Sequence, residues 1–174
     1  MPDPTADVLV KTSVSVREAA ETLSDTYYPA LQNARHTLHT FYLPHTTLPD
    51  GKIVPSIVWN GNVFDDPIKF QKMFEAEMPY TFYDVQSLDV QVLNPRLGLP
   101  HGAEDNEEQR KKWKDVDNVS LLVMVSGFMR LEERRDGPTK MFSETFVLVP
   151  NPERGGKKDV RKWLIQTQNL RYVV

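Results

Sequence analysis

The residues best suited to metal chemistry are histidines on a predicted helix. His36 and His39 are three residues apart, so they share a helix face and have imidazoles of the kind that bind transition metals. No third ligand follows at a recognisable spacing, and histidines on helices are more often surface or core residues. We therefore predict no metal site and no cofactor.

Acid–base catalysis would need a carboxylate or a histidine facing a pocket. Asp84 and Asp89 lie in a long predicted strand and have opposite parity, so only one of them could face a given cavity. The other plausible participants are Tyr27, Tyr28, His36 and His39. No phosphate-binding glycine loop and no nucleophile elbow occurs in the sequence. Solvent-facing carboxylates are the simpler interpretation, and we predict no catalytic residue and no enzyme.

Residues 119–149 form the central part of the scaffold that would position a site. They read as two strands joined by a charged turn at Asp136-Gly137-Pro138. In the first strand Val123 and Val125 point to one face, and Leu122 and Met124 point to the other. Both faces are apolar, whereas an antiparallel sheet usually exposes one polar face to water. Each face must therefore be covered by something.

Composition limits the class of protein. The chain has 174 residues and a net charge of −3, which fits one globular domain and argues against nucleic-acid binding by overall charge. It contains no cysteine, so disulfides and thiolate chemistry are excluded. No signal peptide opens it and no 18-residue apolar run occurs, so we expect a soluble intracellular protein without a membrane partner.

The first half of the chain predicts helices. Residues 1–12 read as a flexible N-terminus, and residues 13–174 as a single domain. Ser13 or Ser15 would cap a helix whose apolar residues recur at helical spacing as far as Phe41. Pro29 predicts a kink or a break near Tyr28.

Turn signals divide the remainder. Residues 45–56 read as a turn-rich connection, and Asn60-Gly61 predicts a hairpin over residues 57–64. Asp65 or Asp66 followed by Pro67 predicts the start of a helix that Pro79 ends. Long strands are expected over residues 80–93, 119–131, 141–149 and 163–174.

Two charged segments interrupt the strands. Residues 94–118 read as a charged insert, either a flexible surface loop or a short solvated helix. Residues 150–162 form a second, basic loop. A solvated turn is the plainer interpretation, and contact with RNA or a ribonucleoprotein particle is the functional one. The candidate contact residues are Lys111, Lys112, Lys114, Lys157, Lys158 and Arg161.

The order of helices first and strands later predicts an α+β fold, with N-terminal helices packed on one face of a bent antiparallel sheet. Helices on one side leave the apolar residues of the other side uncovered. An uncovered apolar surface of this size is typical of a partner site. The sequence therefore predicts dimerisation through the sheet.

Several short motifs in this order resemble the nuclear transport factor 2-like (NTF2-like) family. They are Val58-Trp59-Asn60-Gly61-Asn62, the pattern Phe142-x-x-x-Phe146, and Leu170-Arg171-Tyr172 near the end. The likeness is strongest to the small subunit of the heterodimeric messenger RNA export receptor, and the long insert resembles the fungal type. The resemblance implies a cone-like fold and a non-catalytic subunit whose sheet pairs with the similar domain of the large subunit.

The resemblance also implies site residues. Arg171 matches the interface arginine of the family, which pairs with an acidic residue of the partner. Its parity mates Asn169, Thr167 and Ile165 are placed on the same face. Ser143, Thr145 and Val147 are expected to join them, with Phe142 and Phe146 turned inward to the helices.

Further partners follow from the same resemblance: phenylalanine–glycine nucleoporins, and messenger RNA or pre-ribosomal cargo carried by the complex. The implied location is the nucleus and nuclear pore, with shuttling to the cytoplasm. Two alternatives stay open: a homodimeric nuclear import carrier, or a cavity enzyme of isomerase or dehydratase type. Trp59 is expected in the core, or else at the mouth between hairpin and helices.

Overall fold

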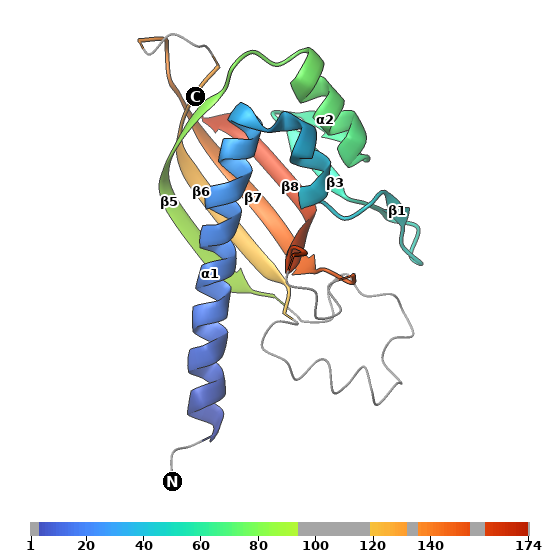
Figure 1. Ribbon diagram of the computed structural model, residues 1–174, viewed down its shortest axis with the longest axis vertical. Helices are drawn as coiled ribbons and strands as arrows, with labels where there is room; N and C mark the ends of the chain where they lie inside the picture. The colour runs from blue at the N-terminus through green and yellow to red at the C-terminus, as the bar shows by residue number, and fades with distance from the viewer. Residues whose placement is uncertain (1–3, 94–118, 132–135, 154–158, 174) are drawn as a thin grey trace.

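A six-stranded sheet with helices on one side forms the body of the protein in a computed structural model (Figure 1). The structure describes residues 4–93, 119–131, 136–153 and 159–173, with side chains in the first helix described from residue 14. The strand order is β4-β3-β8-β7-β6-β5. The predicted α+β class, with N-terminal helices on a mostly antiparallel sheet, is confirmed.

Helix α1 (Pro4–Asn33) is longer than the sequence predicts. It includes residues 4–12, assigned above to a flexible terminus, and begins before Ser13. Pro29 stays inside the helix with its ring exposed, so the expected break near Tyr28 is wrong. The helix ends instead at Asn33, and the next residue, Ala34, has a φ of −139°, outside the helical region. A 3₁₀ helix, η1 (Arg35–Phe41), follows.

The predicted hairpin forms from β3 (Ser56–Trp59) and β4 (Asn62–Phe64). Asn60 and Gly61 have φ values of +46° and +88°. Both central residues are therefore left-handed, as a type I′ turn requires. A short hairpin of β1 (Thr46–Thr47) and β2 (Ile53–Val54) lies inside the connection that read only as turns.

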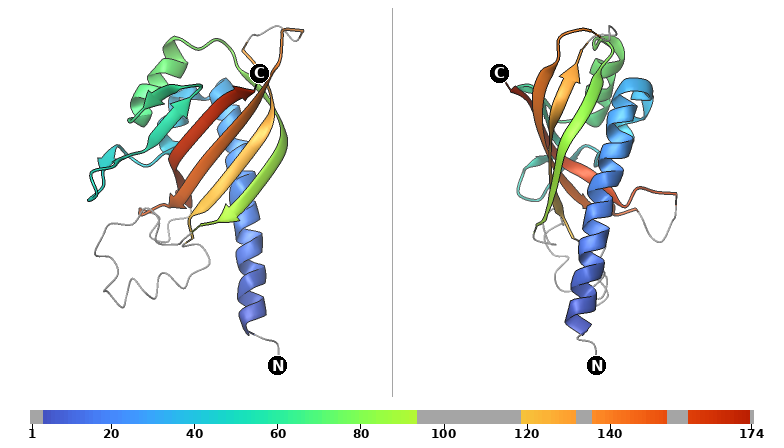
Figure 2. Two further views of the ribbon diagram at one scale, coloured as in Figure 1. Left: turned by 180° about the vertical axis from the view of Figure 1, so that it is seen from behind. Right: turned by 90° about the vertical axis from the view of Figure 1, so that its left-hand side faces the viewer.

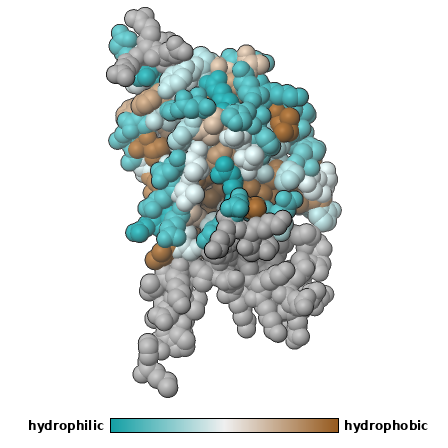
Figure 3. Space-filling view, in the orientation of Figure 1, coloured by the Kyte–Doolittle hydropathy of each residue, from teal (hydrophilic) through white to brown (hydrophobic). Residues whose placement is uncertain are grey.

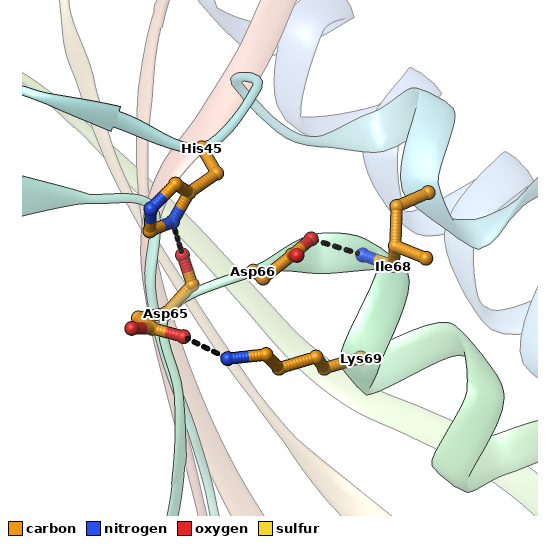
Figure 4. Close-up of polar contacts among 5 residues, drawn as sticks. All are labelled: His45, Asp65, Asp66, Ile68 and Lys69. Atoms are coloured by element: carbon orange, nitrogen blue, oxygen red, sulfur yellow. Dashed lines mark hydrogen bonds and ion pairs between the residues drawn. The ribbon is translucent and has the colours of Figure 1, made fainter.

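Helix α2 (Pro67–Ala76) starts where the sequence predicts (Figure 4). The Asp66 carboxylate accepts a hydrogen bond from the backbone N–H of Ile68 at 2.8 Å, which satisfies one unpaired donor of the first turn. Lys69 forms an ion pair with Asp65, and the His45 ring contacts the Asp65 carbonyl oxygen. These contacts are exposed and fix the entry of the chain into the helix.

Arg35 fastens the helices to each other. Its guanidinium donates hydrogen bonds to the carbonyl oxygens of Leu31, Phe74, Met78 and Pro79 at 2.5–2.8 Å. It thereby satisfies carbonyls at the end of α2 that have no partner within the helix. The Phe74 ring lies under the same guanidinium, 5.5 Å from its carbon.

Four long strands form an antiparallel meander: β5 (Phe82–Val92), β6 (Leu121–Arg130), β7 (Lys140–Pro150) and β8 (Trp163–Val173). The sequence predicts all four within a few residues of these bounds. The parallel pairing of β3 with β8 has no sequence signal and was not predicted. Gly127 of β6 allows a close approach, because a Cβ there would lie 2.0 Å from the Asp84 carbonyl oxygen.

Helices cover only one face of the sheet (Figure 2). The covered face will be called the inner face, and the opposite one the outer face. On β6 the predicted alternation is confirmed: Val123 and Val125 are buried, whereas Leu122 and Met124 are partly exposed. Tyr27 and Leu31 of α1 complete the core with Phe70 and Phe74 of α2. The surface on the helix side is mostly hydrophilic, with separate apolar areas (Figure 3).

Candidate functional site

The outer face is ordered in rows across β6, β7 and β8. One row joins Leu122, Val147 and Thr167, and the next joins Met124, Thr145 and Asn169. A third row joins Ser126, Ser143 and Arg171, and a fourth joins Phe128, Met141 and Val173. The first and fourth rows are mostly apolar, the two rows between them are mostly polar, and Arg171 lies in the third.

No helix among the described elements lies over this face, which the view from behind shows open (Figure 2). Phe128, Met141 and Val173 are 40%, 51% and 47% exposed. Contact between large apolar side chains and water is unfavourable, and burial of this row against a partner would be favourable. The outer face therefore has the composition of a protein interface.

Most residues predicted for the partner face do lie on the outer face. Arg171, Asn169 and Ser143 are exposed, and Thr145, Val147 and Thr167 are partly exposed. Their role in binding a partner stays a prediction.

Ile165 is the exception: it is fully buried in the core, so its placement on this face is wrong. The pairing of β7 with β8 shifts, with Val147 opposite Thr167 but Leu148 opposite Ile165. Gln166 is thus an extra residue in β8, and a bulge of this kind reverses the parity beyond it.

The predicted RNA-contact residues are only partly placed. Lys111, Lys112, Lys114, Lys157 and Lys158 lie outside the described residues. Arg161 is described and is half-buried, with its guanidinium carbon 3.6 Å from the centre of the Phe41 ring. It lies on the helix side of the sheet and not with Arg171.

The inner face holds a second candidate site, a cluster of polar groups sealed inside the core. Glu144 of β7 is 1% exposed, and its carboxylate accepts hydrogen bonds from the Tyr28 hydroxyl and the Gln168 amide, both at 2.7 Å. The Gln168 amide also donates to the Tyr27 hydroxyl at 2.7 Å. Tyr42 lies 2.8 Å from Tyr27 and donates to the Gln168 carbonyl oxygen.

The donors and acceptors of this cluster match one arrangement of protons. Because Tyr42 gives its proton to Gln168, the hydrogen bond between the tyrosines must run from Tyr27 to Tyr42. Gln168 then closes a ring of three by donating to Tyr27, and uses its second amide proton on Glu144. Each tyrosine hydroxyl in the cluster donates to a neighbour inside the core, so none of these protons is offered to a substrate.

Burial raises the pKa of Glu144 from 4.5 to about 7, because a charged carboxylate is poorly solvated in the core. The hydrogen bonds from Gln168 and Tyr28 lower the pKa and offset part of this effect. Burial also raises the pKa of Tyr27, Tyr28 and Tyr42, which keeps their protons in place as donors.

Sequence reasoning found only part of this cluster. Tyr27 and Tyr28 were named, but Glu144, Gln168 and Tyr42 were missed. The signal was present: Glu144 lies between Phe142 and Phe146 on alternate positions of one strand, and both were placed inward.

The other predicted chemical residues stand apart from the cluster. Asp84 pairs with Phe128 and Asp89 pairs with Met124, and both carboxylates are exposed on the outer face. The expectation that they lie on opposite faces is therefore wrong. A register shift at Gln86 in β5 is the cause. His36 is exposed, and the described residues contain no group that could hold a metal ion.

His39 is exposed as well, and its ring nitrogen pairs with Gln71 at 2.6 Å. Trp59 is 6% exposed, with edge-to-face contacts to Phe74 and Tyr172, which places it in the core. No described helix is long and apolar enough to cross a membrane.

Comparison with known proteins gives structural matches alone. No family model and no curated protein sequence matches the chain. Among solved structures, the chain is similar to one from the complex of the Chaetomium thermophilum Mex67 NTF2-like domain with Mtr2. The TM-score is 0.67 with 25% identity over 91% of this chain and 99% of that one.

Two related structures agree. The Mex67:Mtr2 complex with bound Sac3N peptide matches with the same TM-score, identity and coverage, and the structure of Mtr2 matches at a TM-score of 0.66 and 24% identity. A suggested dehydratase of the NTF2-like family from Streptomyces avermitilis matches at a TM-score of 0.60 and 14% identity, over 92% of this chain and 97% of that one. The chain has the NTF2-like fold and structurally resembles Mtr2 of the Mex67:Mtr2 complex.

Proposed function

We propose that this protein is a non-catalytic small subunit of a messenger RNA export receptor, which pairs through its outer sheet face with the NTF2-like domain of a Mex67-type large subunit. The observation that carries the proposal is the open outer face, where a row of exposed apolar side chains lies beside an exposed arginine. The similarity to the Mex67:Mtr2 complex supports the same conclusion.

The chemistry of the face suits such a pairing. A stable interface buries roughly 800 Å² on each partner, with a well-packed apolar centre and a polar rim. Phe128 and Met141 supply apolar anchors, and Arg171 supplies a cation for a carboxylate of the partner. A charged pair closed off from water contributes specificity, and its loss leaves one charge buried without its counterpart.

A charge reversal tests the pairing. We expect Arg171→Glu to weaken binding to a Mex67-type NTF2-like domain by about 2–5 kcal/mol, without unfolding the chain, because it would place two carboxylates together. Titration calorimetry measures the affinity, and circular dichroism checks the fold. Lys72→Glu, an exposed reversal on α2, is the matched control and should bind as the wild type does. Equal affinity of both variants would refute the pairing.

The cavity-enzyme alternative has a specific observation against it. Dehydratase-like proteins share the fold at low identity, and fold alone does not decide function. In this chain the carboxylate and tyrosines that resemble a catalytic set are buried and bonded to one another. A substrate would have to displace that ring. The cluster therefore favours a structural role in the core.

The homodimeric carrier would use the same outer face on two copies of this chain. Arg171 would then be close to its own copy across the symmetry axis unless a carboxylate intervened. Asp84 and Asp89 are the described carboxylates of the outer face, both on the edge strand β5. Arg171 lies near the end of β8 and is separated from β5 by the strands β7 and β6, which favours a different partner that supplies the carboxylate.

The rest of the proposed role follows from the subunit assignment. The heterodimer would help passage through the nuclear pore by contact with phenylalanine–glycine nucleoporins, and would carry messenger RNA, pre-ribosomal particles or both. Its location would be the nucleus and nuclear pore, with shuttling to the cytoplasm. Binding of a Sac3-type peptide to the complex belongs to the same proposal.

A further inference from the structure

A cavity on the helix side, away from the outer face, has no role in the subunit pairing. It has a volume of about 290 Å³ and lies between one stripe of α1 and the residues that lead into β8. Its apolar wall includes Leu23 of α1, Phe41 of η1, and Leu148 and Trp163 of the sheet. A space of this size admits one or two apolar side chains of a ligand.

Arg161 stands at the wall between this cavity and a second hollow, which it also lines. Its guanidinium is stacked on the Phe41 ring at 3.6 Å. It forms no ion pair with a carboxylate of the described residues, where the ion pairs are Arg17–Glu21 and Lys69–Asp65. Burial lowers the pKa of Arg161, and desolvation is the cause.

A partly desolvated guanidinium that no carboxylate of the described residues neutralises is able to pair with an anion from outside the chain. Its donors form a rigid fork that fits a carboxylate with two parallel hydrogen bonds. The Phe41 ring fixes the plane of the guanidinium and so reduces the entropy lost on binding. An acidic group next to the apolar cavity would therefore find a cation already in place.

The surrounding charges decide what kind of anion fits. Glu18 and Lys162 line the cavity, and Glu153 and Asp159 line the adjoining hollow, so the carboxylates outnumber the one cation besides Arg161. These carboxylates would repel a phosphodiester chain, which carries one charge on every nucleotide. A single carboxylate attached to an apolar group can reach Arg161 without bringing further negative charge past them.

We propose that this cavity binds a peptide segment of a partner in which an aromatic or aliphatic side chain is followed by an acidic residue. The apolar side chain enters the cavity against Leu23 and Trp163, and the carboxylate pairs with Arg161. The site is independent of the outer face, so it remains accessible in the heterodimer. It assigns Arg161 to an acidic peptide and not to RNA.

Peptide titrations test this site. The probe is a fluorescein-labelled Gly-Ser-Phe-Asp-Ser-Gly peptide, with the same peptide carrying Asn for Asp as its partner probe, both measured by anisotropy against the full chain. We expect a Kd of about 10–100 µM for the acidic peptide, and at least about 5-fold weaker binding of the Asn peptide. Arg161→Ala should weaken the acidic peptide to the level of the Asn peptide and leave the Asn peptide unchanged.

Four further variants sharpen the result. Thr22→Trp places a bulky ring into the cavity from an exposed position of α1 and should abolish binding of both peptides. Arg161→Lys keeps the charge without the fork and should bind with intermediate affinity. Lys72→Ala, on α2, is the control and should bind both peptides as the wild type does. Arg171→Glu should also leave peptide binding unchanged, which separates this site from the subunit pairing.

Two results would overturn the proposal. One is equal affinity of the Asp and Asn peptides for the wild-type chain, or an affinity that Arg161→Ala does not change. The other is displacement of the acidic peptide by a uridine oligonucleotide at low micromolar concentration in 150 mM salt, since that would identify the cation as an RNA contact.

Discussion

Polar groups have different environments on the two faces of this sheet: they are buried and hydrogen-bonded on the inner face and exposed on the outer face. On the inner face, Glu144 is buried but meets two donors, and its neighbours Tyr27, Tyr42 and Gln168 satisfy one another. On the outer face, Arg171 and the cross-strand Ser143 are exposed, beside a row of apolar side chains open to water. The Glu144 cluster is hydrogen-bonded within this chain, whereas no described element covers the apolar row of the outer face.

The alternation of side chains explains how one strand, β7, contributes both to the core and to the outer face. Residues 142, 144 and 146 of β7 point to the helices, and residues 141, 143 and 145 point outward. Changes at neighbouring positions should therefore affect different properties. Inward changes should alter the free energy of unfolding, and outward changes should alter the free energy of association.

The largest effect on stability is expected for Glu144→Ala. It leaves the Tyr28 hydroxyl and one Gln168 proton without acceptors in the core and opens a cavity, so we expect a loss of about 3–5 kcal/mol. Urea unfolding measures the change. The adjacent Ser143→Ala on the outer face is the control and should change stability by less than about 0.5 kcal/mol. Similar losses for both would mean that the two faces are not separate.

A smaller effect is expected from pH. The pKa of Glu144 is raised to about 7 in the folded chain from an ordinary value of 4.5. The folded state thus holds this proton more tightly, and the resulting stability is fully present below pH 4.5 and lost as the pH rises through about 7. The full difference corresponds to about 3 kcal/mol at most.

Glu144→Gln cannot titrate, so its stability should change less between pH 5 and pH 8 than that of the wild type. Urea midpoints at both pH values measure this difference. Glu77→Gln, an exposed substitution, should retain the wild-type dependence. A wild-type chain that gains stability relative to Glu144→Gln as the pH rises would show that the carboxylate is better stabilised inside the fold than burial implies.

The smallest effect is expected for single hydroxyl groups. Tyr28→Phe removes a donor to Glu144 and should cost about 1–2 kcal/mol, whereas Thr145→Val, on the partly exposed outer face, should be within about 0.5 kcal/mol of neutral. Losing this donor should also raise the pKa of Glu144 further, which moves the loss of stability to higher pH. Thermal unfolding at pH 6 and pH 8 measures both effects.

The sequence predicts the hairpin, the start of α2 and the faces of β6 because their signals are local. Asn60-Gly61, Asp66-Pro67 and the alternation of β6 each depend on neighbouring residues, and all three are confirmed. The errors at Asp89 and Ile165 have one cause. An extra residue, Gln86 in β5 or Gln166 in β8, separates each of them from the residues that set its expected face. Such an extra residue is recognised only from the pairing with the neighbouring strand.

The buried cluster could be predicted only in part for a similar reason. The inward side of Glu144 follows from its parity with Phe142, but its partners come from distant elements. Gln168 lies 24 residues and Tyr28 116 residues away along the chain. Such contacts arise from the packing of α1 and η1 over the sheet, which no local pattern contains.

The central claim, that the outer face binds a partner, can be tested by cysteine footprinting because the natural chain contains no cysteine. Ser143→Cys places one thiol on the outer face, and Thr40→Cys places one on η1, both at exposed positions. Maleimide labelling rates are measured with and without a Mex67-type NTF2-like domain. We predict at least about 10-fold protection at position 143 and none at position 40, since an interface core excludes solvent. Equal labelling of both thiols in a formed complex would contradict the account.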